Sequence, residues 1–258
     1  MLMQKIAEEI VALDFPANAN PKENTAFVDR VGSPEFFCDL IDEIVSNEET
    51  LASVASRSYR HVNHFDKIVL FDDGHPDHAR LTLHLWRPPY SEQEIDDELI
   101  HDHRFSFWSK VLCGDIRSEV FERAEEEDED TRVYRSFSYC PEDKDVENFY
   151  TYLGDVRLKV REFQQTERDS AYYLHFDSIH RICLPDTQAV ATLVLRSPRL
   201  RNHSTVFNSV FPTTDVRVRN VFFSPEGVAE RLGFLRSQIE NRAASVEAAR
   251  ARPQTAVA

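Results

Sequence analysis

Two histidines separated by a single residue begin an aromatic-rich stretch of the chain, ELIHDHRFSFWSKVLCGDI (98–116). His101 and His103 would project from the same face if 101–112 formed one strand, because successive side chains of a strand point to opposite faces. Two neutral imidazoles on one face can bind a single metal ion. Such pairs also occur by chance on strand surfaces, so a metal site requires a third ligand.

A third candidate comes from YYLHFDSIHRI (172–182), which contains two histidines five residues apart. On one uninterrupted strand His175 and His180 would face opposite ways, so at most one of them should face the interior. We expect His180 to be the ligand, because it begins an apolar run after a turn signal and would lie near the start of a strand. His84, in LTLHLW, could line the same interior or lie in the core.

The elements that must position these side chains are predicted to be short strands. From about residue 66 the sequence alternates between apolar and polar residues in KIVLF, ARLTLHLW, FSFWSKVL, DIRSEVF, TRVYRSFSY, VRLKVREF, SAYYLHF and AVATLVLRS. So many short strands without intervening helices favour a β-sandwich or barrel over a parallel α/β sheet.

Helices are predicted at both ends of the chain. Residues 1–60 have apolar residues at helical spacing, and 225–250 begins with Pro225 at the first helical position after a serine cap. We therefore expect a mainly β fold in a single domain, 1–258, with the barrel in 61–220. An acidic insertion near 122–150 contains the run EEEDED.

The composition excludes several classes of function. The formal net charge of −15 argues against a nucleic-acid-binding or anionic-membrane-binding protein, since either would need a basic face. The four cysteines are widely spaced and form no CxxC pair, which is typical of free thiols in a reducing compartment. No signal peptide or membrane-spanning run is evident, so we expect a cytoplasmic protein of undetermined oligomeric state.

The stretch HDHRFSFWSKVLCG resembles the first motif of the cupin superfamily, in which two histidines, a glutamate and a glycine recur at fixed spacing. His101, His103 and Gly114 match this motif, and Phe107 stands where many cupins carry a glutamate ligand. SIHRI resembles the second motif, with His180 at its histidine. The resemblance implies a cupin-like β-barrel, the double-stranded β-helix, with a metal ion bound by His101, His103 and His180.

A cupin with three histidines and no glutamate ligand is similar to the thiol dioxygenases, cysteine dioxygenase among them. That similarity implies Fe(II), with Mn, Ni or Zn as alternatives, and a small anionic substrate such as a thiol or amino acid that reacts with dioxygen. It also places Arg60 of SYRH roughly where the dioxygenases hold a substrate carboxylate. Of Tyr172 and Tyr173, one should face inward by strand parity. We take Tyr173 as a candidate hydrogen-bond donor to a bound oxygen, with core packing as the alternative.

Three functions are compatible with these residues: an Fe(II) oxygenase, a non-redox isomerase, epimerase or hydrolase that uses Zn, Mn or Ni, and a non-catalytic cupin that binds a small ligand. Phe107 in place of glutamate favours the first over the second. Three imidazoles leave positions on Fe(II) open for substrate and dioxygen, whereas structural zinc sites are closed and usually contain thiolates. Metal-binding imidazoles usually donate their second ring N–H to a carboxylate or a carbonyl. The carboxylates close in sequence are Asp96, Asp97, Glu98, Asp102 and Asp177.

Overall fold

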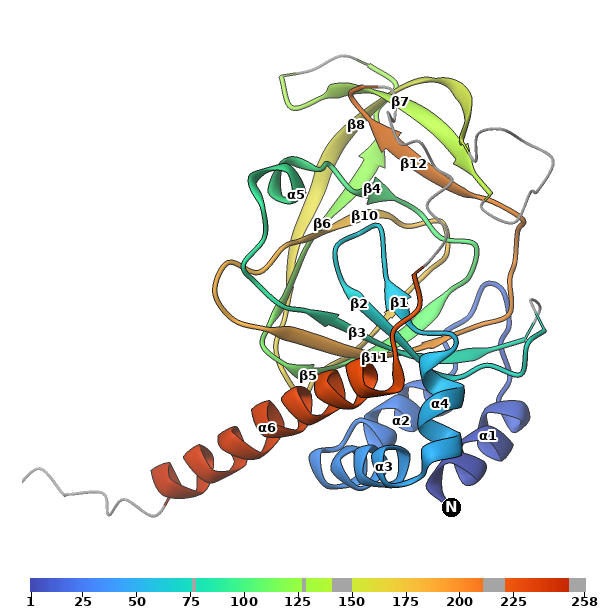
Figure 1. Cartoon of the computed structure of the whole chain (residues 1–258). Coiled ribbons are helices and arrows are strands. Elements are labelled where there is room, and N and C mark those ends of the chain that lie inside the picture. Colours follow the sequence, from blue (N-terminus) through green and yellow to red (C-terminus); the bar gives the residue numbers. More distant parts are fainter. Residues whose placement is uncertain (76–77, 127–128, 141–149, 211–220, 251–258) are drawn as a thin grey trace, which may run out of the picture.

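A computed structural model of the chain describes residues 1–75, 78–126, 129–140, 150–210 and 221–250. Its elements form three layers: a group of helices, a six-stranded sheet that we call sheet A, and a second sheet, sheet B, that closes on itself (Figure 1). In the part of the chain that is described, no helix combines the length and the apolar character needed to cross a membrane.

Sheet A has the strand order β1-β2-β3-β11-β5-β9. Its strands are β1 (Tyr59–Arg60), β2 (Asp66–Phe71), β3 (Arg80–Trp86), β5 (Phe107–Cys113), β9 (Ala171–Leu174) and β11 (Val190–Arg196). Sheet B is a closed barrel of order β10-β4-β12-β7-β8-β6. Its strands are β4 (Ile100–His101), β6 (Ile116–Arg123), β7 (Arg132–Tyr139), β8 (Tyr150–Thr166), β10 (Ile179–Cys183) and β12 (Ser204–Asn208).

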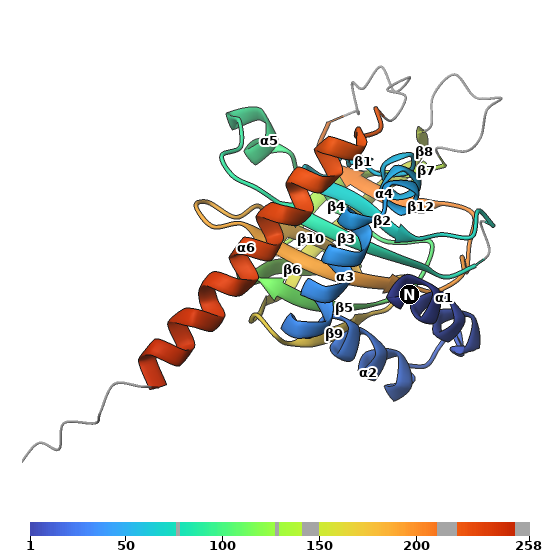
Figure 2. The same cartoon turned by 60° about the horizontal axis from the view of Figure 1, so that its bottom comes forward.

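The helices lie mostly at the two ends of the sequence. They are α1 (Leu2–Ala12), α2 (Lys22–Val31), α3 (Pro34–Ser46), α4 (Glu48–Ala55), the short α5 (Glu92–Asp96) and α6 (Pro225–Arg250). Figure 2 shows α6 lying across the outer face of sheet A beside the N-terminal helices. The helix predicted for 225–250 is confirmed.

Eight of the strands have the connectivity of a jelly roll. In sheet A the order is β3-β11-β5-β9, and facing it in sheet B is β4-β10-β6-β8. Along the chain these eight strands alternate between the two sheets, except that β6 and β8 pair with each other in sheet B. This is the double-stranded β-helix arrangement of cupins. The predicted mainly β, cupin-like fold with helical ends is therefore confirmed by the strand order itself.

The two faces of sheet A follow from the alternation of residues in its strands. In β3, Leu81, Leu83 and Leu85 are fully buried in the core that sheet A shares with the helices. Thr82 and His84 alternate with these leucines and point to the inner face, toward sheet B. Burial of each leucine contributes roughly 1.5–3 kcal/mol, so this core fixes which residues face inward.

The apolar stripe of α6 packs into the same core. Val228, Leu232 and Leu235 are fully buried and Ile239 is 3% exposed. The helix contacts α3 and α4 as well as β5. The stripe expected from the sequence thus attaches the C-terminal helix to the outer side of sheet A.

Sheet B differs from expectation in closing into a small barrel with a core of its own. That core includes Ile100 and Ile179, which are 0% and 7% exposed. The sequence predicts a barrel in 61–220 but not that these six strands close on themselves, because that closure depends on the pairing of β12 with both β4 and β7. Of the acidic insertion predicted near 122–150, residues 127–128 and 141–149 lie outside the described residues.

Candidate metal centre

His101, His103 and His180 converge between the two sheets. One ring nitrogen from each lies within 4.8 Å of the other two. The Nε2 atoms of His103 and His180 are 2.9 Å apart, and the three ring centroids are separated by 4.7–5.0 Å. An ion with bonds of about 2.1 Å holds its nitrogen ligands about 3 Å apart, so small ring rotations bring all three to one ion.

Direct strand pairing positions two of the three histidines. His180 of β10 is the register partner of His101 of β4. Their neighbours Ile179 and Ile100 are buried in the barrel core of sheet B, so alternation turns both imidazoles outward from that barrel and toward sheet A. His180 is the second residue of its strand, as expected from the turn signal before it.

His103 lies in a loop, which corrects the prediction of one strand over 101–112. β4 ends at His101 and β5 begins at Phe107. Asp102, 4% exposed, accepts a hydrogen bond from the Thr205 amide and pairs with Arg201. These contacts hold the backbone away from the strand path.

The same loop is fixed on both sides of His103. The amide of His103 donates to the Phe176 carbonyl at 2.8 Å, and the Nε of Arg201 donates to the His103 carbonyl at 2.8 Å. The loop therefore places this imidazole as firmly as a strand would. The sequence prediction that 101 and 103 share a site is correct, for a reason other than strand parity.

Burial keeps all three imidazoles neutral. Burial is the main reason that the pKa of His101 is lowered. It is also the main reason that the pKa values of His103 and His180 lie well below the usual range. The charges of the neighbouring histidines lower the pKa of His103 further. A metal ion requires the unprotonated ring, so this environment suits ligands.

The tautomer of His101 is set by a backbone carbonyl. Its Nδ1 lies 2.7 Å from the Leu99 oxygen, and because a carbonyl only accepts, Nδ1 carries the proton and Nε2 is free to bind. Of the two expected kinds of acceptor for the second N–H, carboxylate and carbonyl, His101 uses a carbonyl. Asp97 and Asp177 instead contact His64 and His175.

The alternative histidines lie outside the cluster. The Nδ1 of His175 contacts Asp177, and its side chain is 28% exposed. His84 faces the interior and stacks on Phe65 with centroids 4.3 Å apart. Asn63, which the sequence analysis does not single out, lies with its Nδ2 3.5 Å from Nε2 of His101.

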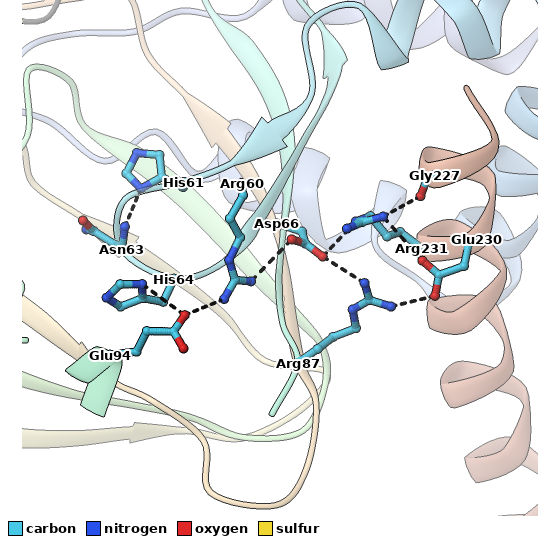
Figure 3. Close-up of polar contacts among 10 residues, drawn as sticks. All are labelled: Arg60, His61, Asn63, His64, Asp66, Arg87, Glu94, Gly227, Glu230 and Arg231. Carbon is cyan, nitrogen blue, oxygen red and sulfur yellow. Dashed lines mark hydrogen bonds and ion pairs between the residues drawn. The ribbon is translucent and has the colours of Figure 1, made fainter. Parts of the chain in front are cut away.

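Arg60 lies at the edge of sheet A and is already paired. Its guanidinium contacts Asp66 at 3.4 Å and Glu94 at 3.3 Å, as Figure 3 shows. Asp66 is 3% exposed and also contacts Arg87 and Arg231, so it connects β1 and β2 to α6. The role of Arg60 as a substrate clamp stays a prediction.

Of the two tyrosines of β9, Tyr172 faces the interior. Tyr172 is the register partner of Ser109, and its ring lies 6.2 Å from that of Phe107. Tyr173 pairs with Trp108, and the two rings pack 5.1 Å apart in the core under the helices. Tyr173 thus has the core-packing position that the sequence analysis gives as the alternative. Its role as a hydrogen-bond donor to a bound oxygen remains a prediction.

Comparisons with known proteins give no family. No protein-family model matches the sequence, and no curated protein matches it. Among solved structures the chain is similar to the DMSP lyase DddQ from Ruegeria pomeroyi DSS-3, with 9% identity, a TM-score of 0.33, and 78% of this chain and 94% of that one covered. It is also similar to Cellulomonas parahominis L-ribose isomerase with L-ribose, with 12% identity, a TM-score of 0.28, and 74% and 94% covered. At these TM-scores neither likeness carries an argument, and the fold assignment rests on the strand order.

Proposed function

We propose that this protein is a mononuclear non-haem Fe(II) oxygenase of cupin fold that acts on a small anionic metabolite. The observation that carries the proposal is the convergence of three neutral imidazoles, His101, His103 and His180, within 4.8 Å. Fe(II) fits this donor set, because three nitrogen ligands leave coordination positions for a substrate and dioxygen.

The charge of the donor set favours an anionic substrate. Three neutral ligands leave the +2 charge of the ion uncompensated, so thiolates, carboxylates or enolates are bound best. When bound, the ion would supply polarisation of the substrate and activation of dioxygen. The chain supplies the orientation, and the rings of Phe105 and Phe107 pack 5.5 and 5.2 Å from that of His103.

A second candidate is a non-redox isomerase, epimerase or hydrolase that uses Zn, Mn or Ni at the same three histidines. Lys67 supports it, because burial lowers the pKa of this interior amine to about 7. A base with a pKa near the working pH is suited to proton abstraction. The two candidates share the metal site and differ in the metal and in the need for dioxygen.

Metal analysis of protein purified without oxygen separates these candidates. We expect one iron per chain in the wild type and its loss in the His101→Ala variant. His175→Ala is the matched control, because His175 lies outside the cluster and should leave the metal content unchanged. Zinc, manganese or nickel in place of iron would favour the non-redox enzyme, and no retained metal would contradict both.

Oxygen consumption then tests the reaction. Iron-loaded protein is supplied with a panel of thiols and amino acids in an oxygen electrode. We expect at least one compound to raise the rate in the wild type and none to do so in His101→Ala. Iron-loaded protein that never consumes oxygen with any anionic compound would refute the oxygenase.

A further inference from the structure

Lys67 lies on the inner face of sheet A without a partner of its own. Its register partner in β3 is His84, and its neighbours along β2, Asp66 and Ile68, point to the helix-covered side. In the described part of the chain, the side-chain amine of Lys67 makes no ion pair or hydrogen bond. An enclosed amine of this kind is costly unless something pairs with it.

Arg196 is a second unsatisfied cation on the same face. It is 4% exposed, its Nη1 donates to the Ser197 carbonyl at 3.2 Å, and its Nη2 is buried with no hydrogen-bond partner. In β11, Leu193 and Leu195 belong to the core under the helices, so alternation directs Arg196 inward. A buried guanidinium nitrogen without an acceptor can donate to an acceptor that a ligand supplies.

The two cations share the inner face of sheet A, because His84, the register partner of Lys67, pairs with Thr192 of β11, and Arg196 follows four residues later on the same face of that strand. Arg196 is the first charge among those that lower the pKa of Lys67 to about 7, after burial itself. Lys67 in turn contributes to lowering the pKa of His103. The Phe105 ring contacts both His103 and Arg196. Its centroid is 5.5 Å from the centroid of the His103 ring and 5.0 Å from the Arg196 guanidinium.

Nearby acidic groups do not neutralise these cations. Asp72 raises the pKa of both Lys67 and Arg196, but its carboxylate is ion-paired with Nε of Arg80 at 2.7 Å. Lys67, His84 and His103 all keep part of their surface accessible although they face inward. These three residues are therefore partly accessible to a small molecule.

We propose that Lys67 and Arg196 form an anion subsite that binds the carboxylate of a small substrate whose other end faces the three histidines. An arginine binds a carboxylate through two parallel hydrogen bonds, and its free Nη2 is the group that such a ligand would satisfy. Because one aromatic ring separates the two ends, the substrate carries its carboxylate several bonds away from the group that meets the metal. The orientation of this ligand rests on the proposed metal function, whereas the anion binding itself does not.

The test measures succinate binding by calorimetry on the metal-free protein and Co(II) binding by visible absorption. The proteins are the wild type, Lys67→Met, Arg196→Met and the charge-preserving Lys67→Arg, with exposed Lys5→Met as the matched control. We expect Lys67→Met and Arg196→Met each to weaken succinate binding at least tenfold, and Lys67→Arg and Lys5→Met to change it less than threefold. Co(II) affinity should stay the same or rise in Lys67→Met, because a repelling charge is removed and no ligand is touched.

Equal succinate affinity in the wild type, Lys67→Met and Arg196→Met would overturn the subsite. Failure of the metal proposal looks different: Co(II) does not bind, while succinate binding still depends on Lys67 and Arg196. A measurement on the wild type alone covers the case in which a variant does not fold. Succinate should slow reductive methylation of Lys67 severalfold and leave Lys5 unaffected, as read by peptide mass spectrometry, and equal rates at Lys67 would count against the proposal.

Discussion

Replacing Lys67 by methionine is expected to stabilise the metal-free protein, and to do so more at pH 7 than at pH 9. Burial and the charge of Arg196 lower the pKa of the Lys67 amine in the folded protein from 10.5 to about 7. Each pKa unit corresponds to about 1.4 kcal/mol, so the folded state bears a penalty on the order of 5 kcal/mol below pH 7. Because part of the side chain stays accessible, water makes this an upper value.

The sign of the pH dependence follows from proton binding. Between pH 7 and 10.5 the unfolded chain holds a proton on Lys67 that the folded chain has lost, so the free energy of unfolding rises with pH in this window. By pH 9 the penalty has fallen to about 2 kcal/mol. The advantage of Lys67→Met over the wild type should therefore shrink by up to about 2 kcal/mol between pH 7 and pH 9.

Chemical denaturation in the presence of EDTA measures this difference. The free energy of unfolding is determined for the wild type, Lys67→Met and exposed Lys5→Met at both pH values. Lys5→Met should differ from the wild type by the same small amount at each pH. A stability difference between Lys67→Met and the wild type that is negative, or that does not change with pH, would refute the assignment of Lys67 as an enclosed, unpaired amine.

Three further predictions concern the scaffold of the site. Asp102→Asn should weaken Co(II) binding about tenfold or more in a visible titration, because the loop that carries the second histidine loses its ion pair; unchanged affinity would contradict this role. Gly114→Ala should lower the free energy of unfolding by about 2 kcal/mol or more, since φ is +64° and a Cβ would lie 2.6 Å from the Ala189 oxygen. Gly74→Ala is the control, because Gly74 has φ +83° but open space around it, and it should lower the free energy of unfolding by only about 1 kcal/mol. Equal losses of stability in Gly114→Ala and Gly74→Ala would show that crowding at Gly114 is unimportant. Asp66→Asn should lower the melting temperature and cost about 2–4 kcal/mol, because arginines from three segments lose a buried carboxylate; a loss under 0.5 kcal/mol would show that these ion pairs are not needed.

Local patterns carried much of the fold prediction. The alternation in LTLHLW identified the strand, because one face of β3 is leucine and the other is mixed, but it left open whether His84 lines the interior or lies in the core. The turn signal before His180 correctly placed it near a strand start. Such features depend on neighbours within a few residues, and the sequence contains those neighbours directly.

Contacts between distant segments explain what could not be predicted. The break between β4 and β5 at Asp102 depends on Arg201 and Thr205, about a hundred residues further along the chain. The choice between Tyr172 and Tyr173 depends on the β5–β9 register, which alternation within β9 alone does not determine.

The approach of Lys67 to Arg196 was missed for a similar reason. Each residue alone looks like an ordinary charge at a strand end. Their proximity arises only when β2, β3 and β11 lie side by side in sheet A. A cation that alternates with core residues, as Arg196 does after Leu193 and Leu195, was the signal available in the sequence.

X-ray absorption of the iron-loaded protein tests the central claim most directly. The extended fine structure is expected to show three imidazole nitrogens at about 2.1 Å from the iron, and two in a His180→Ala variant. Fewer than three imidazoles in the wild type, or the same number in both proteins, would show that His101, His103 and His180 do not share one ion.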